Sequence, residues 1–298
     1  MILVAGATGM LGGIITQTLL GQGKDVRILV RHNSPSEAMA AQGMATSAQT
    51  LIDAGAQPIY GDLKDRASLD QAVAGVDTVI TTANSVLRGG EDTVETVDLH
   101  GNLNLIAAAQ TAGVGHFIFT SVLGADSTST IPLVRNKAQA ETALRESGIS
   151  TTILAPNLFA EVWIGAVVGA PLRAGQPVTL VGEARRKHAF VSLVDVAAFA
   201  VAAVDNPAAR NVTIPIAGPQ GLSWREVVAL AGQVLGQELP VVFVQPGEPV
   251  PFVPQAVQES LAVQNTYDSV IPMDEIAAVY GVTLTPMAQV LRRMFGSS

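Results

Sequence analysis

The chain has 298 residues, of which 48% are hydrophobic and 14% charged, with a formal net charge of −8 and no cysteine. This composition supports one large or two modest folded domains and gives little sign of disorder. The negative charge argues against a nucleic-acid surface. The lack of cysteine excludes disulfides, thiolate zinc sites and cysteine nucleophiles. No basic region precedes the first apolar run, and the apolar run over 193–204 is too short to span a bilayer. We therefore expect a cytoplasmic protein that has no membrane partner.

The chain opens on a short apolar run, Ile2–Ala5, which predicts a buried strand. Gly6, Gly9 and Gly12 follow at regular spacing, and 12–20 reads as a helix. In a dinucleotide-binding turn the first glycine allows the tight bend, the second admits the pyrophosphate and the third lets the helix pack on the strand. The free N–H groups at the start of the helix then face the anion. The stretch predicts a dinucleotide site.

Strand and helix patterns alternate up to Pro156. Further strands are predicted at 26–30, 57–60, 78–82, 116–121 and 150–154, and helices at 46–54, 67–73, 101–111 and 136–146. This order predicts an α/β fold, a Rossmann-type doubly wound parallel sheet, over 1–156. Apolar rather than alternating strands fit a sheet that is covered on both faces.

The pattern becomes irregular over 157–298. Helices are predicted at 161–168, 256–262, 274–280 and 286–295, and strands at 178–181, 210–216 and 241–244. Ser223 and Glu226 have the spacing of a capping box that opens a helix through Leu235. We expect this half to form mainly a small mixed α/β substrate-binding cap, with some segments returning to the first sheet.

Arg31 directly follows the second predicted strand, where folds that prefer NAD usually carry an acidic residue for the ribose 2′-hydroxyl. A guanidinium instead suits the 2′-phosphate of NADP. The alternative is a solvated surface arginine. We predict a preference for NADP(H) over NAD(H), with His32 and Ser34 as further candidates for the same phosphate.

Two other strand ends add candidate cofactor contacts. Asp62 follows the third strand and is a candidate acceptor for the adenine amino group, with Leu63 against the ring. The alternative for Asp62 is a turn or N-cap residue. Small residues after the fourth strand, Thr82, Ala83 and Asn84, would let the backbone approach the middle of the cofactor.

Together these residues resemble the NmrA-like group, an atypical branch of the short-chain dehydrogenase/reductase superfamily. The resemblance is carried by GATGMLG at 6–12, Val30 and Arg31, GDL at 61–63, FTS at 119–121, Lys137 and APNLF at 155–159. It implies NADP-dependent reductases of quinones, dyes or isoflavonoids and ethers, or redox sensors that bind NADP without chemistry. It also implies cofactor contacts at Thr8, Met10, Leu11, Lys137, Pro156, Asn157 and Phe159.

One departure from the superfamily concerns its Tyr-x-x-x-Lys motif. Lys137 matches the lysine, but Leu133 stands where the proton-donating tyrosine would be. Ser121 matches the catalytic serine of the superfamily. By this resemblance the predicted catalytic residues are Lys137 and Ser121, and Lys137 would also hold the nicotinamide ribose. The alternative is that Lys137 is a surface lysine on its helix.

The predicted substrate-binding residues are Phe159, Trp163 and Tyr267. Phe159 and Trp163, with Phe190, are candidates for an aromatic wall, and the alternative for each is a place in the core. The four histidines show no metal-ligand spacing, and no metal site is predicted.

A missing tyrosine favours conjugated acceptors, because delocalised charge reduces the need for acid catalysis. We therefore predict an NADP(H)-dependent oxidoreductase that transfers hydride to a small-molecule substrate such as a quinone or enone. A non-catalytic NADP(H)-sensing regulator and a sugar-nucleotide epimerase or dehydratase are the alternatives. The expected assembly is a monomer or homodimer.

Overall fold

The computed structural model describes residues 1–32, 40, 45–85, 89–253 and 255–296. The chain divides into two compact units. The first comprises Met1–Pro156, Val196–Pro215 and Tyr280–Val282, and the second comprises Asn157–Asp195, Ile216–Val279 and Thr283–Ser298. Each unit is built around a core of its own.

A seven-stranded sheet organises the first unit, in the order β3-β2-β1-β4-β5-β6-β8. Its strands are β1 (Ile2–Ala5), β2 (Val26–Val30), β3 (Gln57–Tyr60), β4 (Thr78–Thr81), β5 (His116–Thr120), β6 (Ser150–Pro156) and β8 (Val212–Ile216). From β3 to β6 every neighbouring pair is parallel. Starting from β1, the chain adds β2 and β3 on one side and then β4, β5 and β6 on the other. The point between β1 and β4 is therefore the switch point at which such sheets bind ligands. The Rossmann-type α/β fold is thus confirmed.

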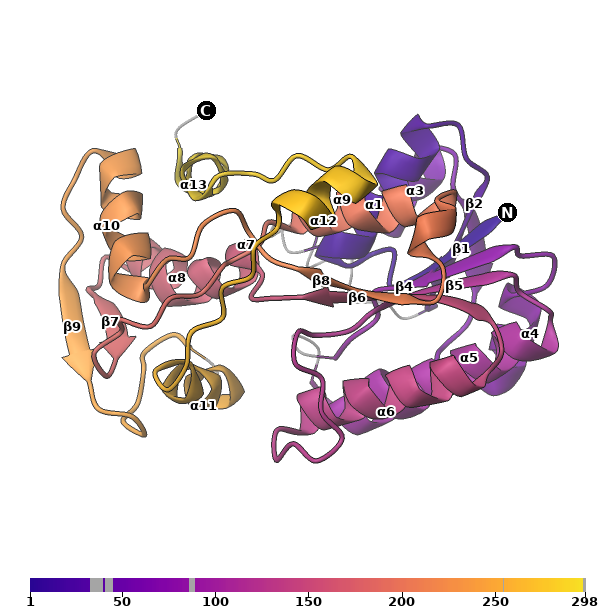
Figure 1. Ribbon diagram of the computed structural model, residues 1–298, viewed down its shortest axis with the longest axis horizontal. Helices are drawn as coiled ribbons and strands as arrows, with labels where there is room; N and C mark the ends of the chain where they lie inside the picture. Colours follow the sequence, from indigo (N-terminus) through magenta and orange to yellow (C-terminus); the bar gives the residue numbers. More distant parts are fainter. Residues whose placement is uncertain (33–39, 41–44, 86–88, 254, 297–298) are drawn as a thin grey trace. The chain divides into compact units, whose positions relative to one another are not determined.

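Helices cover both faces of this sheet (Figure 1). The helices α1 (Met10–Gly21) and α9 (Leu193–Val204) lie across one face. The helices α4 (Arg66–Ala72), α5 (Asn102–Thr111) and α6 (Pro132–Glu146) lie across the other, and α3 (Ala48–Asp53) packs beside α1. Alternate strand residues such as Leu3, Val79 and Phe117 join the core with α4, α5 and α6. Strands buried on both faces explain the continuous apolar runs of the sequence.

Two helical segments of the first unit depart most from the sequence prediction. A π-helical segment, η1 (Val94–Gly101), precedes α5 and was not predicted; Thr93 and Thr96 cap it reciprocally. The helix α6 begins at Pro132, four residues before the predicted start. Proline at the first helical position has a fixed φ that suits the helix and needs no N–H partner there.

The second unit holds a two-stranded parallel sheet of β7 (Val178–Val181) and β9 (Val241–Val244). Its helical segments are α7 (Ala160–Ile164), η2 (Gly165–Gly169), α8 (Ala170–Arg173), α10 (Trp224–Leu235), α11 (Gln255–Gln264), α12 (Asp274–Tyr280) and α13 (Met287–Phe295). A short 3-10 turn, η3 (Pro207–Ala209), belongs to the first unit. The predicted capping box is confirmed, because Ser223 and Glu226 cap α10 reciprocally. The predicted helix at 161–168 is divided between α7 and η2. Across the described ranges, every helix is too short or too polar to cross a bilayer.

Candidate functional site

The glycine turn between β1 and α1 is tightly packed. Gly6 has a φ of 84°, a conformation that favours glycine. A Cβ on Gly12 would lie 2.1 Å from the Gly6 carbonyl oxygen, so only glycine fits there. A Cβ on Gly9 would lie 3.2 Å from the same oxygen, so Gly9 is less confined. Gly9 is the N-cap of α1, and among the described residues no side chain caps that helix start. Met10 and Leu11 form its first turn.

A cavity opens beside this turn, at the carboxyl ends of β1 to β4. Residues of the glycine turn and of the segments that follow β2, β3 and β4 line it: Gly6, Thr8, Leu29, Arg31, Gly61, Asp62, Leu63, Ala83, Asn84, Asp92 and Val97. This set brings together Thr8, Arg31, Asp62, Leu63, Ala83 and Asn84 from the predicted cofactor residues. A helix start with free N–H groups beside such a cavity fits a bound dinucleotide pyrophosphate.

Arg31 is held by a carboxylate that the sequence analysis missed. Its Nη1 donates to Asp92 Oδ2 at 2.6 Å, and Lys64 Nζ donates to Asp92 Oδ1 at 3.0 Å. Burial raises the pKa of Asp92, but the hydrogen bonds from Lys64 and Arg31 outweigh burial and hold that pKa below its usual range. The alternative of a fully solvated Arg31 is therefore wrong.

The phosphate contacts proposed for His32 and Ser34 stay predictions. His32 is exposed and its ring stacks on Tyr60, with centroids 4.6 Å apart. Ser34 lies outside the described residues.

Asp62 lies in a turn and also lines the cavity. Its Oδ1 accepts from the Lys64 backbone N–H at 2.9 Å, while Asp65 is the N-cap of α4. The turn interpretation of Asp62 is correct as far as its own contacts go, and within the described residues the hydrogen bond to its carboxylate is made at Oδ1. The hydroxyl of Thr82 donates to the Gly6 carbonyl at 3.3 Å, which ties the end of β4 to the glycine turn.

Lys137 is buried, and the alternative of a surface lysine is wrong. Its Nζ donates to the Thr120 carbonyl at 3.1 Å, lies 3.5 Å from Asp98 Oδ1 and lies 4.9 Å from the Phe119 ring centroid. Asp98 is itself fully buried on η1, and its Oδ2 accepts from the Ser85 N–H at 3.0 Å and the Ser85 hydroxyl at 2.7 Å. Burial lowers the pKa of Lys137, and Asp98 partly opposes that shift.

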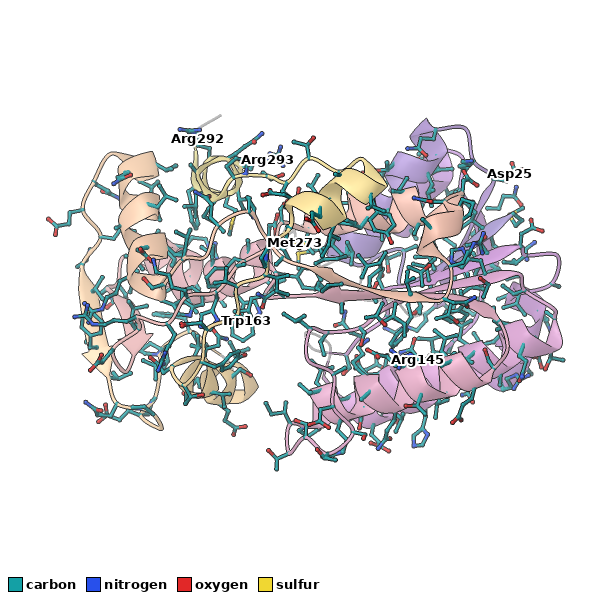
Figure 2. The ribbon with its side chains drawn as sticks, viewed as in Figure 1. Asp25, Arg145, Trp163, Met273, Arg292 and Arg293 are labelled. Atoms are coloured by element: carbon teal, nitrogen blue, oxygen red, sulfur yellow. The ribbon has the colours of Figure 1, made fainter. Side chains whose placement is uncertain are left out.

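The hydroxyl of Ser121, predicted to be catalytic, is already bonded within the fold. Ser121 follows β5 and donates to Glu141 Oε1 on α6. Arg145 Nη2 donates to the other oxygen of Glu141 at 2.8 Å. Figure 2 labels Arg145 on α6, one turn beyond Glu141. The carboxylate orients Ser121 and is itself paired with a cation.

Predicted residues beyond β6 belong to the second unit, whereas Pro156 ends β6 in the first. Asn157 Nδ2 donates to the Ser269 carbonyl at 2.8 Å. Phe159 is the N-cap of α7, and Trp163, labelled in Figure 2, is half-buried against the core of the unit.

The aromatic side chains of the second unit mostly pack against other residues of that unit. The ring of Tyr267, 45% exposed, lies edge-on to His188 at 5.6 Å. Phe190 is buried against Trp224, which is the core alternative for that residue. Among the described rings, none of the aromatic contacts joins Phe159 to Trp163.

Several charged residues in these contacts were not singled out from the sequence, among them Lys64, Asp92, Asp98 and Glu141. Asp98 lies between Val97 and Leu99, and an acidic residue flanked by two apolar residues is a weak signal of burial. Asp92 lies in a polar loop and gave no such signal. Over the described ranges, no three histidine, aspartate or glutamate side chains gather as metal ligands.

Comparison with known proteins places this geometry in a family. The chain is 32% identical over 249 residues to the photosystem II assembly factor Ycf39 of Cyanophora paradoxa, covering 82% of this chain and 73% of the relative. It is 30% identical over 237 residues to an NAD(P)H azoreductase of Xenophilus azovorans, covering 80% and 74%. The crystal structure of Citrobacter sp. triphenylmethane reductase complexed with NADP(H) superposes with a TM-score of 0.80 at 25% identity, covering 99% of this chain and 100% of the other. Residues 1–285 match the NmrA-like family. This chain belongs to the NmrA-like family.

Proposed function

We propose that this protein is an NADP(H)-dependent reductase that transfers hydride to a small conjugated acceptor such as a quinone or enone. The observation that carries the proposal is the glycine turn at the sheet's switch point, where Gly12 has no room for a side chain and a cavity opens over the ends of β1 to β4. An azoreductase and a triphenylmethane reductase among the similar proteins support the same reaction class.

Several parts of the cavity would hold the cofactor. The turn at Gly6 to Gly12 would receive the pyrophosphate at the start of α1. Asp62 and Leu63 would meet the adenine, and Arg31, which follows β2 and lines the same cavity, would meet the adenosine ribose. Lys137 is the candidate for the nicotinamide ribose, as the resemblance to reductases of this type implies.

When bound, reduced nicotinamide supplies a hydride, which carries two electrons and one proton. A quinone or enone that accepts the hydride becomes an anion and needs one further proton to form the neutral product. Lys137 is a candidate donor of that proton, because burial lowers the pKa of its ammonium group. Ser121 would position the acceptor rather than release a proton, since its hydroxyl donates to Glu141.

A non-catalytic NADP(H)-binding protein is the second candidate. The observation that favours it is the pairing within the described residues of Lys137 with Asp98 and of Ser121 with Glu141. Both predicted catalytic groups are therefore engaged in structural contacts. The assembly-factor relative is compatible with such a role.

One experiment separates the two candidates. NADPH binding is measured by calorimetry, and turnover is measured by loss of reduced-nicotinamide absorbance with quinones, enones and triphenylmethane dyes. The reductase proposal expects turnover that falls about a hundredfold when Lys137→Met is combined with Asp98→Asn, which removes both buried charges together. Lys24→Met, on a half-buried lysine paired with Asp205, is the control.

The outcome decides between the candidates directly. NADPH binding without reduction of any acceptor favours the non-catalytic protein. A folded protein that does not bind NADPH contradicts both candidates. The same preparation reports the expected monomer or homodimer by its sedimentation.

A further inference from the structure

Asp92 lies between two cations that belong to different strand ends. Arg31 follows β2 and Lys64 follows β3, and both donate to the Asp92 carboxylate, at 2.6 and 3.0 Å. Asp92 is only 11% exposed at its side chain, against 25% for Arg31 and 31% for Lys64. Arg31 and Asp92 line the same cavity beside the glycine turn. The carboxylate is therefore part of the nucleotide cavity and not a distant surface charge.

The loop that carries Asp92 has a defined local structure. The Asp92 N–H donates to the Gly89 carbonyl at 3.3 Å, and the Thr96 hydroxyl donates to the Glu91 carbonyl at 2.7 Å. Thr93 then caps η1. These contacts hold Asp92 at the start of the π-helical segment independently of its ion pair with Arg31.

A carboxylate at this position works against a phosphate ligand. The 2′-phosphate of NADPH needs cationic donors, and both nearby cations already have an anionic partner. A second anion would compete with Asp92 for them or suffer its repulsion. The 2′-hydroxyl of NADH carries no charge, and an acidic side chain suits it as a hydrogen-bond acceptor.

We propose that Asp92 determines the cofactor specificity of this site, because its carboxylate competes with the 2′-phosphate of NADPH for Arg31 and Lys64. This inference rests on the proposed binding of NADP(H) and refines it. Arg31 alone would give a strong preference for NADPH, and Asp92 reduces that preference.

The test measures the dissociation constants of NADPH and NADH for the wild type, Asp92→Asn and Glu91→Gln by calorimetry. A hydrogen bond to a charged group is worth about tenfold to a hundredfold in affinity, so Asp92→Asn should raise the NADPH-over-NADH ratio by roughly that factor. Glu91 is the neighbouring residue, its side chain is 97% exposed, and it lies 4.0 Å from Lys64. Glu91→Gln removes the same charge from the same loop and should change the ratio by less than about threefold.

A double variant shows whether the effect acts through Arg31. Asp92→Asn should raise the NADPH-over-NADH ratio much less in an Arg31→Ala background, because the main cation that it releases is gone. Adenosine 2′,5′-bisphosphate and adenosine 5′-monophosphate are titrated alongside the dinucleotides. They should show the same change in ratio, since only the 2′-phosphate distinguishes them.

The possible failures are distinguishable. Binding of neither dinucleotide by the folded wild type would overturn the proposed function as well. Binding of both, with one ratio shared by the wild type, Asp92→Asn and Glu91→Gln, would overturn the role of Asp92 alone. If Asp92→Asn does not fold, Asp92→Ser is measured instead, and an unchanged ratio in that variant has the same meaning.

Discussion

Asp98→Asn tests whether one carboxylate keeps Lys137 charged inside the fold. Asp98 Oδ1 lies 3.5 Å from Lys137 Nζ, and both side chains are almost completely buried. Asparagine has nearly the same shape and can still accept from Ser85. The substitution therefore removes the negative charge and little else.

The expected cost follows from the distance between the two charges. Two unit charges 3.5 Å apart attract by about 5 kcal/mol at an effective dielectric constant of ~20. Breaking a buried pair commonly costs about 3–5 kcal/mol, because one charge is left without a partner. Lys137 can avoid that cost only by giving up its proton.

Loss of that proton gives the variant a characteristic pH dependence. In the unfolded chain Lys137 binds its proton up to its ordinary pKa of 10.5, whereas in folded Asp98→Asn burial lowers that pKa and the carboxylate that opposed the shift is gone. Where the unfolded state holds more protons than the folded state, stability rises with pH, by up to about 1.4 kcal/mol per unit for one group. The variant should therefore lose less stability at pH 9 than at pH 7.

Urea unfolding at pH 7 and pH 9 measures both quantities. We expect Asp98→Asn to lose about 3–5 kcal/mol at pH 7 and less than that at pH 9, relative to the wild type. Asp98→Asn combined with Lys137→Met should recover much of the loss, since no charge remains buried. Asp70→Asn, at an exposed residue paired with Arg66, is the control. A loss below about 1 kcal/mol at both pH values would refute the view that Asp98 holds Lys137 charged.

Four further predictions concern the glycine turn, a buried histidine and the absent tyrosine. Gly12→Ala should destabilise the fold by about 3 kcal/mol or more in urea unfolding, because its Cβ would lie 2.1 Å from the Gly6 carbonyl oxygen. Gly9→Ala should fold but bind NADPH at least about tenfold more weakly by titration, because its Cβ would meet the pyrophosphate. Burial, with a smaller contribution from Arg210, lowers the pKa of His116 to about 4, so the unfolded state binds the extra proton between about pH 4 and 6.5. Stability should therefore fall by about 2 kcal/mol from pH 7 to pH 5, and His116→Gln should abolish that part of the fall in urea unfolding. Leu133→Tyr should create a ketone reductase activity that the parent lacks, measured by NADPH oxidation with simple ketones.

Each of these has an opposite result that counts against it. Normal NADPH affinity in Gly9→Ala would contradict the placement of the pyrophosphate, and a stable Gly12→Ala would contradict the close approach of helix and turn. Parallel pH profiles for His116→Gln and the wild type would show that His116 is not the group that titrates. A Leu133→Tyr protein that folds and binds NADPH but reduces no ketone would show that the missing tyrosine does not set the reaction class.

Local sequence patterns predicted the frame of the nucleotide cavity well. The strands Ile2–Ala5, Val26–Val30 and Gln57–Tyr60 have the predicted bounds. Short apolar runs predict parallel strands that are buried on both faces, and the glycine spacing predicts a turn whose backbone lies close to its neighbours. The same patterns predict that a ligand binds at the carboxyl ends of the strands.

The partners of the charged residues came only from the tertiary structure. Arg31 and Asp92 are far apart in the sequence and meet because the parallel strands that precede them end at the same edge of the sheet. Lys137 and Asp98 are also far apart, and they meet because α6 packs against η1. The unexpected π-helical segment η1 begins just after Asp92 and carries Asp98, so it sets the position of both carboxylates. A residue's identity determines whether it can carry a charge, whereas burial and long-range pairing determine what that charge contacts. For this reason the sequence alone determined the nucleotide-binding fold. Only the tertiary structure, through the placement of η1 beside the strand ends, decided which cations of the site are paired.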